Sequence, residues 1–524
     1  MSSSKSKFDR REFVKGGAGV FGAAALAGPL AFLHTKKLHA AHAAGDMCGI
    51  RTESPYGPLY PTADKATGLE LIMLPEGFQY ETFSWTGDAM SDGNPVPEDL
   101  DGMAVVATVF PGNNKNSNGK ANEIVLIRNH EVTGGPPIAA THAYNPNAGG
   151  GTTVLRWKNG KLIDSRVSVA GTWNNCAGGP TPWGTWLTGE ETLATVNGIP
   201  HGYIFESLPF ASDADRDAWG TPVPLTDMGR FSHEAVAVDP ATGFVYETED
   251  ESTTSNLIDS SGRRRGNSGF YKFVPNDASG VPGSLEAGGT LYMLRAVGPE
   301  GPVLDLRDPE CFSEYDVEWI EITNPNGAPP DGRISAAYYE GWQQAGARFQ
   351  RLEGCWWDPV QEVVVFVDTE GGSEAAGTEG AVWAYDPKTE KLHNIFVSQG
   401  ALVPEAYGSD NPDNVTVSPR GGILLCEDGG TDDGDGLSLL GLLPNGQTFE
   451  FARNIINIGV LDAPALLAAG RDPLRVAEWI AEGDFSGNEW AGATFDPTGR
   501  TLFVNIQTPG ITFAITGPWM KGPF

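Results

Sequence analysis

Short segments rich in β-branched and aromatic residues alternate with turn residues along most of the chain. One unit recurs: a β-rich segment, a turn that contains Asp-Pro or Ser-Pro, and a second β-rich segment, as in AVAVDPATGFVYETED around Asp239. Turn chemistry of this kind between two such segments is typical of a β-hairpin. The pattern predicts six hairpins, whose turns lie at Asn159-Gly160, Asp239, Asp358, Asp386, Ser418 and Asp496.

Long helical periodicity is scarce, and the sequence predicts helices only as insertions over residues 334–351 and 463–481. Hairpins that repeat at irregular intervals of tens of residues are typical of a β-propeller with inserted loops. A β-sandwich is the structural alternative, but it seldom repeats one turn so often. We therefore predict an all-β fold: a six-bladed β-propeller with inserted loops and short peripheral helices, which residues 44–524 build as a single domain.

The first residues carry the pattern of an export signal. Arg10 and Arg11 precede a weakly apolar run over residues 16–33, and Ala41-His42-Ala43 provides a small-x-small cleavage site. An arginine pair in this place is typical of the twin-arginine route, which is an address and not an anchor. We expect residues 1–43 to be a cleaved twin-arginine signal peptide, with the twin-arginine export machinery as a partner. A periplasmic or extracellular protein without a stable membrane anchor follows, and export in the folded state favours a bound metal or cofactor.

The chain is strongly acidic, with a formal net charge of −32. So acidic a surface argues against nucleic acid or an anionic membrane as a partner. Clustered carboxylates repel one another unless a cation neutralises them, so part of this charge could serve bound metal. The chain contains 5 cysteines. In an oxidising compartment at least one of them stays unpaired, and they are too few for a disulfide scaffold.

Cys176 lies in a polar, glycine-rich stretch, GTWNNCAGGPTPWGTWLTGEET, with Glu190 and Glu191 close behind it. A disulfide, a redox thiol and a metal thiolate are all compatible with this setting. Further carboxylates and amides stand in short groups at other predicted strand ends: Asn129-His130-Glu131, His233-Glu234, Glu249-Asp250-Glu251, Arg351 with Glu353, Asp413-Asn414, Glu427-Asp428 and Glu489.

A single group of this kind is ordinarily a solvated strand end, but so many of them are harder to dismiss. Hard cations take six to eight oxygen ligands, and iron accepts carboxylate, imidazole and thiolate. Two interpretations remain open for His130 and His233. They have a functional role as metal ligands or general acids, or they are structural residues held by hydrogen bonds. The sequence has no G-x-S-x-G, Walker loop or CxxC pair, which removes the usual support for a serine hydrolase, a nucleotide site or a zinc ribbon.

A series of motifs follows in order from about Asp101 to the C-terminus: LIRNHE, NCAGGPTPWGTWLTGEE, GRFSHEAVAVDP with YETEDE, RLEG, DNPDN, LLCEDG, and NEWAGATFDPTGRTLFVNIQTPG with ITGPW. In these motifs, and in the arginine-pair signal, the chain resembles the PhoX-type alkaline phosphatases. The resemblance implies a six-bladed propeller that hydrolyses phosphomonoesters with an iron–calcium cluster at the mouth of its channel.

By this resemblance Cys176 is a thiolate ligand of iron (Fe³⁺), and Arg351 is a side chain that binds phosphate, so both are implied in catalysis. The carboxylates implied as ligands of the iron and calcium are Glu190, Glu191, Glu234, Asp250, Glu353, Asp413, Asp428 and Glu489. The chain departs from the family in two ways. It is shorter than the longer members, and Asn174 stands where arginine is expected, which could alter the affinity for phosphate.

The sequence thus predicts a secreted or periplasmic, metal-dependent alkaline phosphatase that acts on small phosphomonoesters as a monomer. One alternative is a calcium-dependent propeller lactonase or esterase, which would need neither Cys176 nor a phosphate-binding Arg351. The other is a non-catalytic propeller stabilised by calcium, in which the acidic groups would be scattered around the rim instead of gathered at one mouth.

Overall fold

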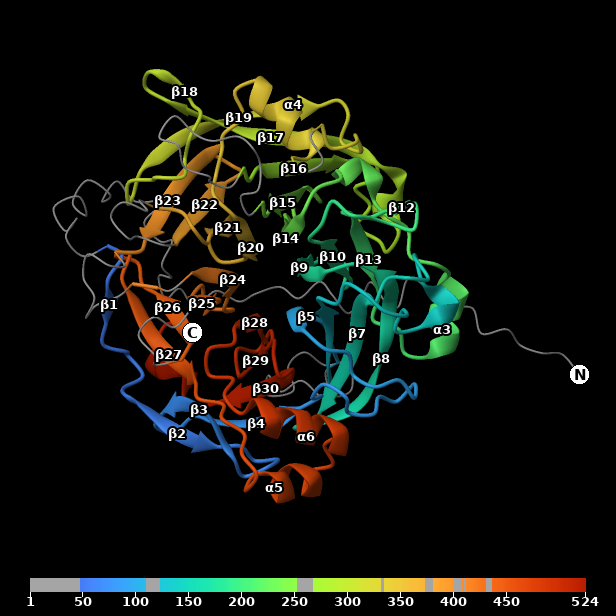
Figure 1. The fold of residues 1–524 in the computed structure, drawn as a ribbon. Helices are drawn as coiled ribbons and strands as arrows, with labels where there is room; N and C mark the ends of the chain where they lie inside the picture. The colour runs from blue at the N-terminus through green and yellow to red at the C-terminus, as the bar shows by residue number, and fades with distance from the viewer. Residues whose placement is uncertain are drawn as a thin grey trace, which may run out of the picture.

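The computed structural model describes residues 48–109, 123–251, 267–330, 334–372, 380–399, 408–409, 411–429 and 436–524. The predicted export signal, residues 1–43, lies outside the described residues. Within them the protein has the predicted all-β fold, and its helices are short. The sheets are arranged around a common centre (Figure 1). The helices that lie in the connections are α3 (Asp213–Trp219), α4 (Ala336–Gln343), α5 (Ala463–Ala468) and α6 (Pro473–Glu482).

Six inner strands form a closed ring at the centre of the molecule (Figure 1). Each of them packs against the next one along the chain, and the last packs against the first. In order they are β5 (Leu100–Val109), β9 (Asn175–Pro180), β14 (His233–Val238), β20 (Leu352–Asp358), β24 (Pro412–Val417) and β28 (Trp490–Phe495). Side chains that start these strands are therefore brought together from across most of the sequence.

Antiparallel strands lead outward from each inner strand. From β5 they are β6 (Glu123–His130), β7 (Gly150–Lys158) and β8 (Lys161–Thr172); from β9, β10 (Trp186–Glu190) and β13 (Ile204–Ser207); from β14, β15 (Val245–Glu249), β16 (Phe270–Pro275) and β17 (Gly289–Gly298). From β20 they are β21 (Val363–Asp368), β22 (Ala381–Asp386) and β23 (Lys391–Val397); from β24, β25 (Ile423–Glu427), β26 (Ser438–Leu442) and β27 (Thr448–Asn454); from β28, β29 (Thr501–Ile506) and β30 (Ile511–Thr516).

Strands from the N-terminal part complete sheets that the C-terminal part begins. β4 (Gln79–Phe83) pairs with β30, while β3 (Glu70–Pro75) pairs with both β27 and β2 (Leu59–Ala63). Elsewhere β19 (Glu314–Ile322) pairs with both β17 and β23, and so joins the sheets of β14 and β20. These pairings tie the two parts of the chain to one ring.

All six predicted hairpins are confirmed: the paired strands are β7–β8, β14–β15, β20–β21, β22–β23, β24–β25 and β28–β29. The predicted helices are only partly right. The first is α4 alone, which starts after the N-cap Ser335 and ends well before Arg351. The second is divided into α5 and α6, because Gly470 adopts a φ of 85° and Asp472 caps a new helix that begins at Pro473.

Each inner strand carries a β-bulge near its start. In β5, Leu100 is paired with His130 and Met103 with Arg128, so two residues of β5 lie opposite the single residue between them. The other five inner strands show the same shift. The bulged pairs are Asp101-Gly102, Cys176-Ala177, Glu234-Ala235, Glu353-Gly354, Asp413-Asn414 and Gly492-Ala493. Because a bulge re-aims a side chain, this regular defect gives each strand a local change of direction at one end of the ring.

The second residue of five bulged pairs is glycine or alanine, and Asn414 is the exception. At two of the glycines the neighbouring inner strands approach closely. A β-carbon at Gly102 would lie 2.6 Å from the Cα of Ala177, and one at Gly354 would lie 2.6 Å from the backbone nitrogen of Val415. Backbone cannot move aside as a flexible side chain can. The small residues therefore set how tightly the ring closes.

A disulfide joins Cys48 to Cys311, while Cys176, Cys355 and Cys426 are free and buried. Of the interpretations open for Cys176, a disulfide is thus not the one found. In the part of the chain that the structure describes, none of the helices combines the length and the apolar character needed to cross a bilayer.

We expect the Gly102→Ala variant to be less stable than the wild type by about 1–3 kcal/mol, the usual cost of overpacking a tight contact. The midpoint of urea unfolding measures this change. Gly134→Ala is the control, because a β-carbon at Gly134 meets nothing within 4 Å. Equal midpoints for the two variants would contradict the close approach of β5 and β9.

Candidate metal centre

Five of the six bulges begin with a residue that can bind a metal: Asp101, Cys176, Glu234, Glu353 and Asp413. The acidic residues and the cysteine come from five different inner strands, yet their donor atoms lie close together. The sixth bulge begins with Gly492, where a β-carbon would lie 2.4 Å from the carbonyl oxygen of Asp101. At the sixth inner strand the acid is instead Glu489, directly before β28.

A second set of carboxylates follows the second strand of several sheets. Glu131 comes directly after β6, Glu191 after β10, Asp250 after β15 and Asp428 after β25. Since the second strand runs antiparallel to the inner strand, its end lies beside the start of that strand. Both sets of residues therefore occupy the same end of the ring.

Four overlapping groups of donors connect these residues, and within each group the donor atoms lie within 4.8 Å of one another. Cys176, Glu234 and Asp413 each belong to two of the groups, so the groups form one continuous cluster. The groups are Asp101–Glu131–Cys176, Cys176–Glu191–Glu234, Glu234–Glu353–Asp413 and Asp413–Asp428–Glu489. Among the described residues the acids are gathered at one end of the ring, unlike the scattered rim that a merely structural role predicts.

Burial and mutual repulsion raise the pKa of several of these groups. Burial, followed by the charges of Asp413 and Glu191, raises the pKa of Glu234 well above its usual value. Burial is also the main cause that raises the pKa of Glu131 to about 7 and that of Asp413 to about 7. The pKa of the Cys176 thiol is raised too, by burial and then by Asp101. A cation would remove these penalties, because metal binding displaces the protons.

The hydrogen bonding of the cluster fits such cations. Both carboxylate oxygens of Glu234 and Oδ1 of Asp101 are buried without a hydrogen-bond partner among the described residues. The Cys176 thiol donates to Oδ2 of Asp101 over 3.2 Å. Buried carboxylates without partners suit a hard cation, and a thiol among them suits a transition metal as its thiolate.

Arg351 is a cationic side chain beside the cluster. It lies just before β20, has a φ of 51°, and forms ion pairs with Asp250 over 2.8 Å and with Glu353 over 2.9 Å. Its side chain remains 25% exposed, whereas those of the two acids are buried. The guanidinium therefore lies between the cluster and solvent, where it could contact an anion.

Glu190 does not face the cluster, although Glu191 does. Its carboxylate accepts hydrogen bonds from Nδ1 of His201 over 2.6 Å and from the backbone nitrogens of Trp173, Gly202 and Tyr203 over 2.8, 2.8 and 3.2 Å. With these partners Glu190 fastens the loops on either side of β10. It belongs to none of the four donor groups formed by the described residues.

Both histidines considered from the sequence occupy structural positions. His130 contacts the carbonyl of Glu98 over 3.1 Å and Oγ1 of Thr153 over 2.9 Å. His233 contacts the carbonyl of Gly229 over 3.2 Å, and burial lowers its pKa to about 3. Neither ring belongs to the donor groups found in the described part of the chain.

The sequence analysis did not select Asp101 or Glu131 as ligands, although both lie in the cluster. A signal for each was present. Asp101-Gly102 repeats the acid-and-small pair Glu353-Gly354, and Glu131 directly follows a predicted strand as Glu191 does. Both signals become visible only once the hairpins are aligned on their bulges.

Neutral amides hold Glu131 and Glu191 at the edge of the cluster. Nδ2 of Asn174 donates to Glu131 over 3.0 Å and to Glu191 over 3.2 Å, and Nε2 of Gln507 donates to the other oxygen of Glu131 over 2.6 Å. Asn174 therefore orients two carboxylates from neighbouring sheets without neutralising their charge.

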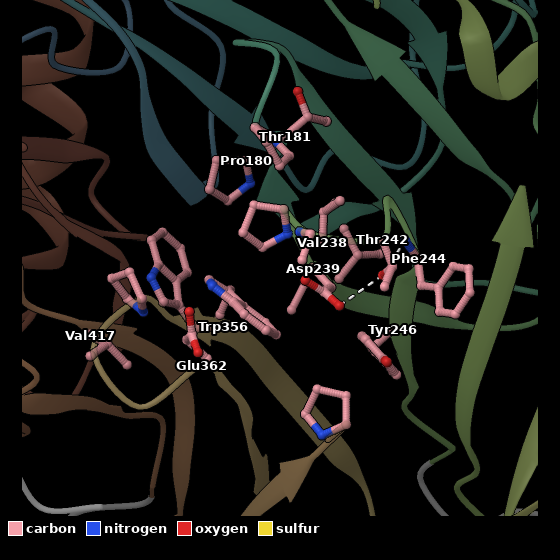
Figure 2. A pocket seen from close by; sticks show the side chains of 18 of the residues that line it. Pro180, Thr181, Val238, Asp239, Thr242, Phe244, Tyr246, Trp356, Glu362 and Val417 are labelled. Atoms are coloured by element: carbon pink, nitrogen blue, oxygen red, sulfur yellow. Dashed lines mark hydrogen bonds between the residues drawn. The ribbon is translucent and has the colours of Figure 1, made fainter. Parts of the chain in front are cut away.

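A cavity of about 890 Å³ lies at the opposite end of the inner strands (Figure 2). It is lined by residues at the ends of these strands and in the turns beyond them, such as Pro180, Val238, Trp356 and Val417, and it is largely apolar. The lining contains none of the clustered donors. Its place and chemistry separate it from the metal centre.

Comparison with known proteins gives a family match that spans most of the chain. The sequence matches the family described as Alkaline phosphatase PhoX over residues 54–163 and 138–510. Among solved structures, the fold is similar to that of Pseudomonas fluorescens PhoX in complex with vanadate, a transition state analogue. The identity is 18%, the TM-score is 0.56, and the match covers 88% of this chain and 97% of that one.

A weaker likeness is to the holo form of the PQQ domain of pyranose dehydrogenase from Coprinopsis cinerea. Its identity is 9% and its TM-score 0.40, with 85% of this chain and 97% of that one covered. No curated protein sequence matches the chain.

The protein without metal should become less stable as the pH rises from about 4 to about 7. The carboxyls of Glu131 and Asp413 have a pKa near 7 in the folded state, against ordinary values of 4.5 and 3.8. In this interval the folded state binds more protons than the unfolded state, so the free energy of unfolding falls with rising pH. The measurement is the melting temperature in a chelator at several pH values. Asp413→Asn should flatten the slope, and a slope unchanged in this variant would contradict the assignment.

Proposed function

Because the chain belongs to the PhoX family of alkaline phosphatases and is a phosphomonoesterase, we propose that the clustered donors of the ring hold the metal ions of its active site. The observation that carries this proposal is the convergence of the bulged residues Asp101, Cys176, Glu234, Glu353 and Asp413. Five inner strands each aim a metal-binding side chain at one place, and the carboxylates of Asp101, Glu234 and Glu353 are buried there and repel one another. Because the chain belongs to a family of phosphatases, the alternatives of a lactonase or esterase and of a non-catalytic propeller are not pursued.

We assign the iron to Cys176, because only this cysteine lies among the donors of the described residues. The carboxylates available to the same ion are those of its two donor groups: Asp101, Glu131, Glu191 and Glu234. The remaining carboxylates offer oxygen alone and suit calcium; they are Glu353, Asp413, Asp428 and Glu489. Glu190 keeps a supporting role in this assignment. Asp250, expected as a ligand, is paired with Arg351 and orients the guanidinium.

Bound cations would supply positive charge to the phosphoryl oxygens and make a water molecule more acidic. The chain itself contributes Arg351, whose guanidinium can form two parallel hydrogen bonds with phosphoryl oxygens. Asp250 contacts Nε and Nη2 of Arg351, and so fixes the direction of the guanidinium. A phosphate ester would then be held between Arg351 and the cluster, where developing negative charge meets fixed positive charge.

The proposal also includes the number of propeller blades, the extent of the domain and the export of the protein. A ring of six inner strands, each with its own outward strands, supports a six-bladed propeller formed by residues 44–524 as one domain. The arginine pair and cleavage pattern support removal of residues 1–43 during twin-arginine export to the periplasm or the exterior. We further propose that the enzyme acts as a monomer on small phosphomonoesters.

The wild-type protein, purified after export, should contain iron and calcium and hydrolyse p-nitrophenyl phosphate at alkaline pH. Cys176→Ala should lose iron and activity together, because the carboxylates that remain favour a harder ion. Metal analysis and the hydrolysis rate are measured on the same samples. Cys355→Ala is the control, since this thiol is also free and buried but lies in a hydrophobic cluster. A protein that holds calcium only and is indifferent to the loss of Cys176 would contradict the iron assignment.

Arg351→Gln should lower kcat/KM for p-nitrophenyl phosphate by about 10²–10³-fold, the usual effect of removing one donor to developing charge. Inhibition by inorganic phosphate should weaken as well, while bound metal stays. Arg295→Gln serves as the control, because Arg295 pairs with the exposed Glu318 on the surface. An Arg351→Gln enzyme with unchanged kcat/KM would exclude the phosphate-binding role.

A further inference from the structure

In three places the backbone of a clustered residue is held by a side chain from the hairpin of the preceding inner strand. Nδ2 of Asn129 on β6 donates to the carbonyl of Cys176, and Nδ2 of Asn505 on β29 donates to the carbonyl of Asp101, over 3.0 and 2.7 Å. Oγ1 of Thr248 on β15 donates to the carbonyl of Glu353 over 2.6 Å. The same arrangement therefore recurs: the second strand of one hairpin reaches the bulge of the next inner strand in the ring.

Asn129 is the most completely engaged of the three. Besides Cys176, its Nδ2 donates to the carbonyl of Ala177 over 2.6 Å. Its Oδ1 accepts from Nε1 of Trp186 and from Oγ1 of Thr188, both over 2.9 Å. Two donors and two lone pairs are thus all used, and the side chain is fully buried. No atom of this amide is left to bind a metal or a substrate.

The residue before Cys176 belongs to the same network. Nδ2 of Asn175 donates to Oγ1 of Thr188 over 2.9 Å, and Oδ1 of Asn175 accepts from Oγ1 of Thr172 over 2.5 Å. Thr188 therefore links Asn129 to Asn175. Through this link the backbone on both sides of the Cys176 side chain is fixed to neighbouring strands.

We propose that Asn129, Thr248 and Asn505 are positioning residues for the metal centre, and that Asn129 sets the position of the Cys176 thiolate. The distance between two donors from different sheets depends on how those sheets sit against each other. A hydrogen bond from one hairpin to the bulge of the next inner strand fixes this distance at the residue that binds. The inference rests on the proposed function, since it concerns the metal that the cluster holds.

The test uses the full-length exported protein with Asn129→Leu, which keeps the branched shape of the side chain but removes both donors and both acceptors. Each variant is freed of metal with a chelator and titrated with citrate-buffered Fe³⁺ in the presence of Ca²⁺. We expect Asn129→Leu to bind iron about 10–100-fold more weakly, the usual effect of losing a residue that supports a ligand. We also expect the metal to raise the melting temperature of this variant less than that of the wild type.

Asn394→Leu is the matched control, because Asn394 is a buried amide on β23 that donates to the carbonyls of Val382 and Phe396, away from the cluster. It should lower the melting temperature with and without metal by equal amounts and leave iron affinity unchanged. If Asn129→Leu does not fold, Thr188→Val removes one of the hydrogen bonds to Oδ1 at nearly constant volume. It should weaken iron binding in the same direction, by less.

Iron affinity equal to wild type in the folded Asn129 or Thr188 variant, with only a lower melting temperature, would overturn the positioning role and leave the proposed function intact. A wild-type protein that binds neither ion would overturn both. The two failures are therefore distinguishable by the wild-type titration alone.

Discussion

Repulsion among buried carboxylates is the constraint on which the rest of this structure depends. Glu234 lies between two donor groups, with neither oxygen hydrogen-bonded within the described residues, and neighbouring acids add to the penalty of its burial. A flexible scaffold would relieve this repulsion by moving the acids apart. The closed ring prevents such movement, because each inner strand packs between two others. A cation that binds here removes the repulsion between the carboxylates, and this gain in free energy makes its binding tighter.

The β-bulge is the device that makes the convergence compatible with a sheet. In a regular strand, alternate residues point to opposite faces, so a side chain cannot turn toward the axis of the ring without breaking the ladder. Two residues opposite one allow the first to turn inward, while the second must be small where the strands crowd. The bulge at Gly492 is the one of the six that does not carry a metal-binding side chain. At that bulge a neighbouring carbonyl fills the space of a side chain, so Glu489 supplies the acid from outside the strand.

The sequence predicted all six hairpins but only part of the metal centre, because a hairpin depends on residues close in sequence and the metal centre on residues far apart. A hairpin turn is decided by residues next to each other, and all six were recognised from Asp-Pro, Ser-Pro or Asn-Gly turns. The centre depends on contacts between sheets, which single segments do not reveal. The residues alone left three interpretations of Cys176, and only the family resemblance favoured a metal thiolate. Glu190 and Glu191 look equivalent in the sequence, yet the adjacent side chains diverge, one toward His201 and the other toward the cluster.

Within one hairpin, hydrogen bonding distinguishes a carboxylate that closes a turn from a carboxylate that can bind metal. Asp239, in a turn at the far end of β14, accepts from the backbone nitrogen of Ala241 over 2.8 Å and from Oγ1 of Thr242 over 2.7 Å. The turn supplies its own donors, so this acid needs no cation and serves to close the hairpin. Glu234, at the start of the same strand, lies on a bulge that offers its carboxylate no donor. A carboxylate that finds no hydrogen-bond donor within its own hairpin remains available to a cation. Because such carboxylates lie at the starts of the inner strands, the cation would bind at the centre of the ring.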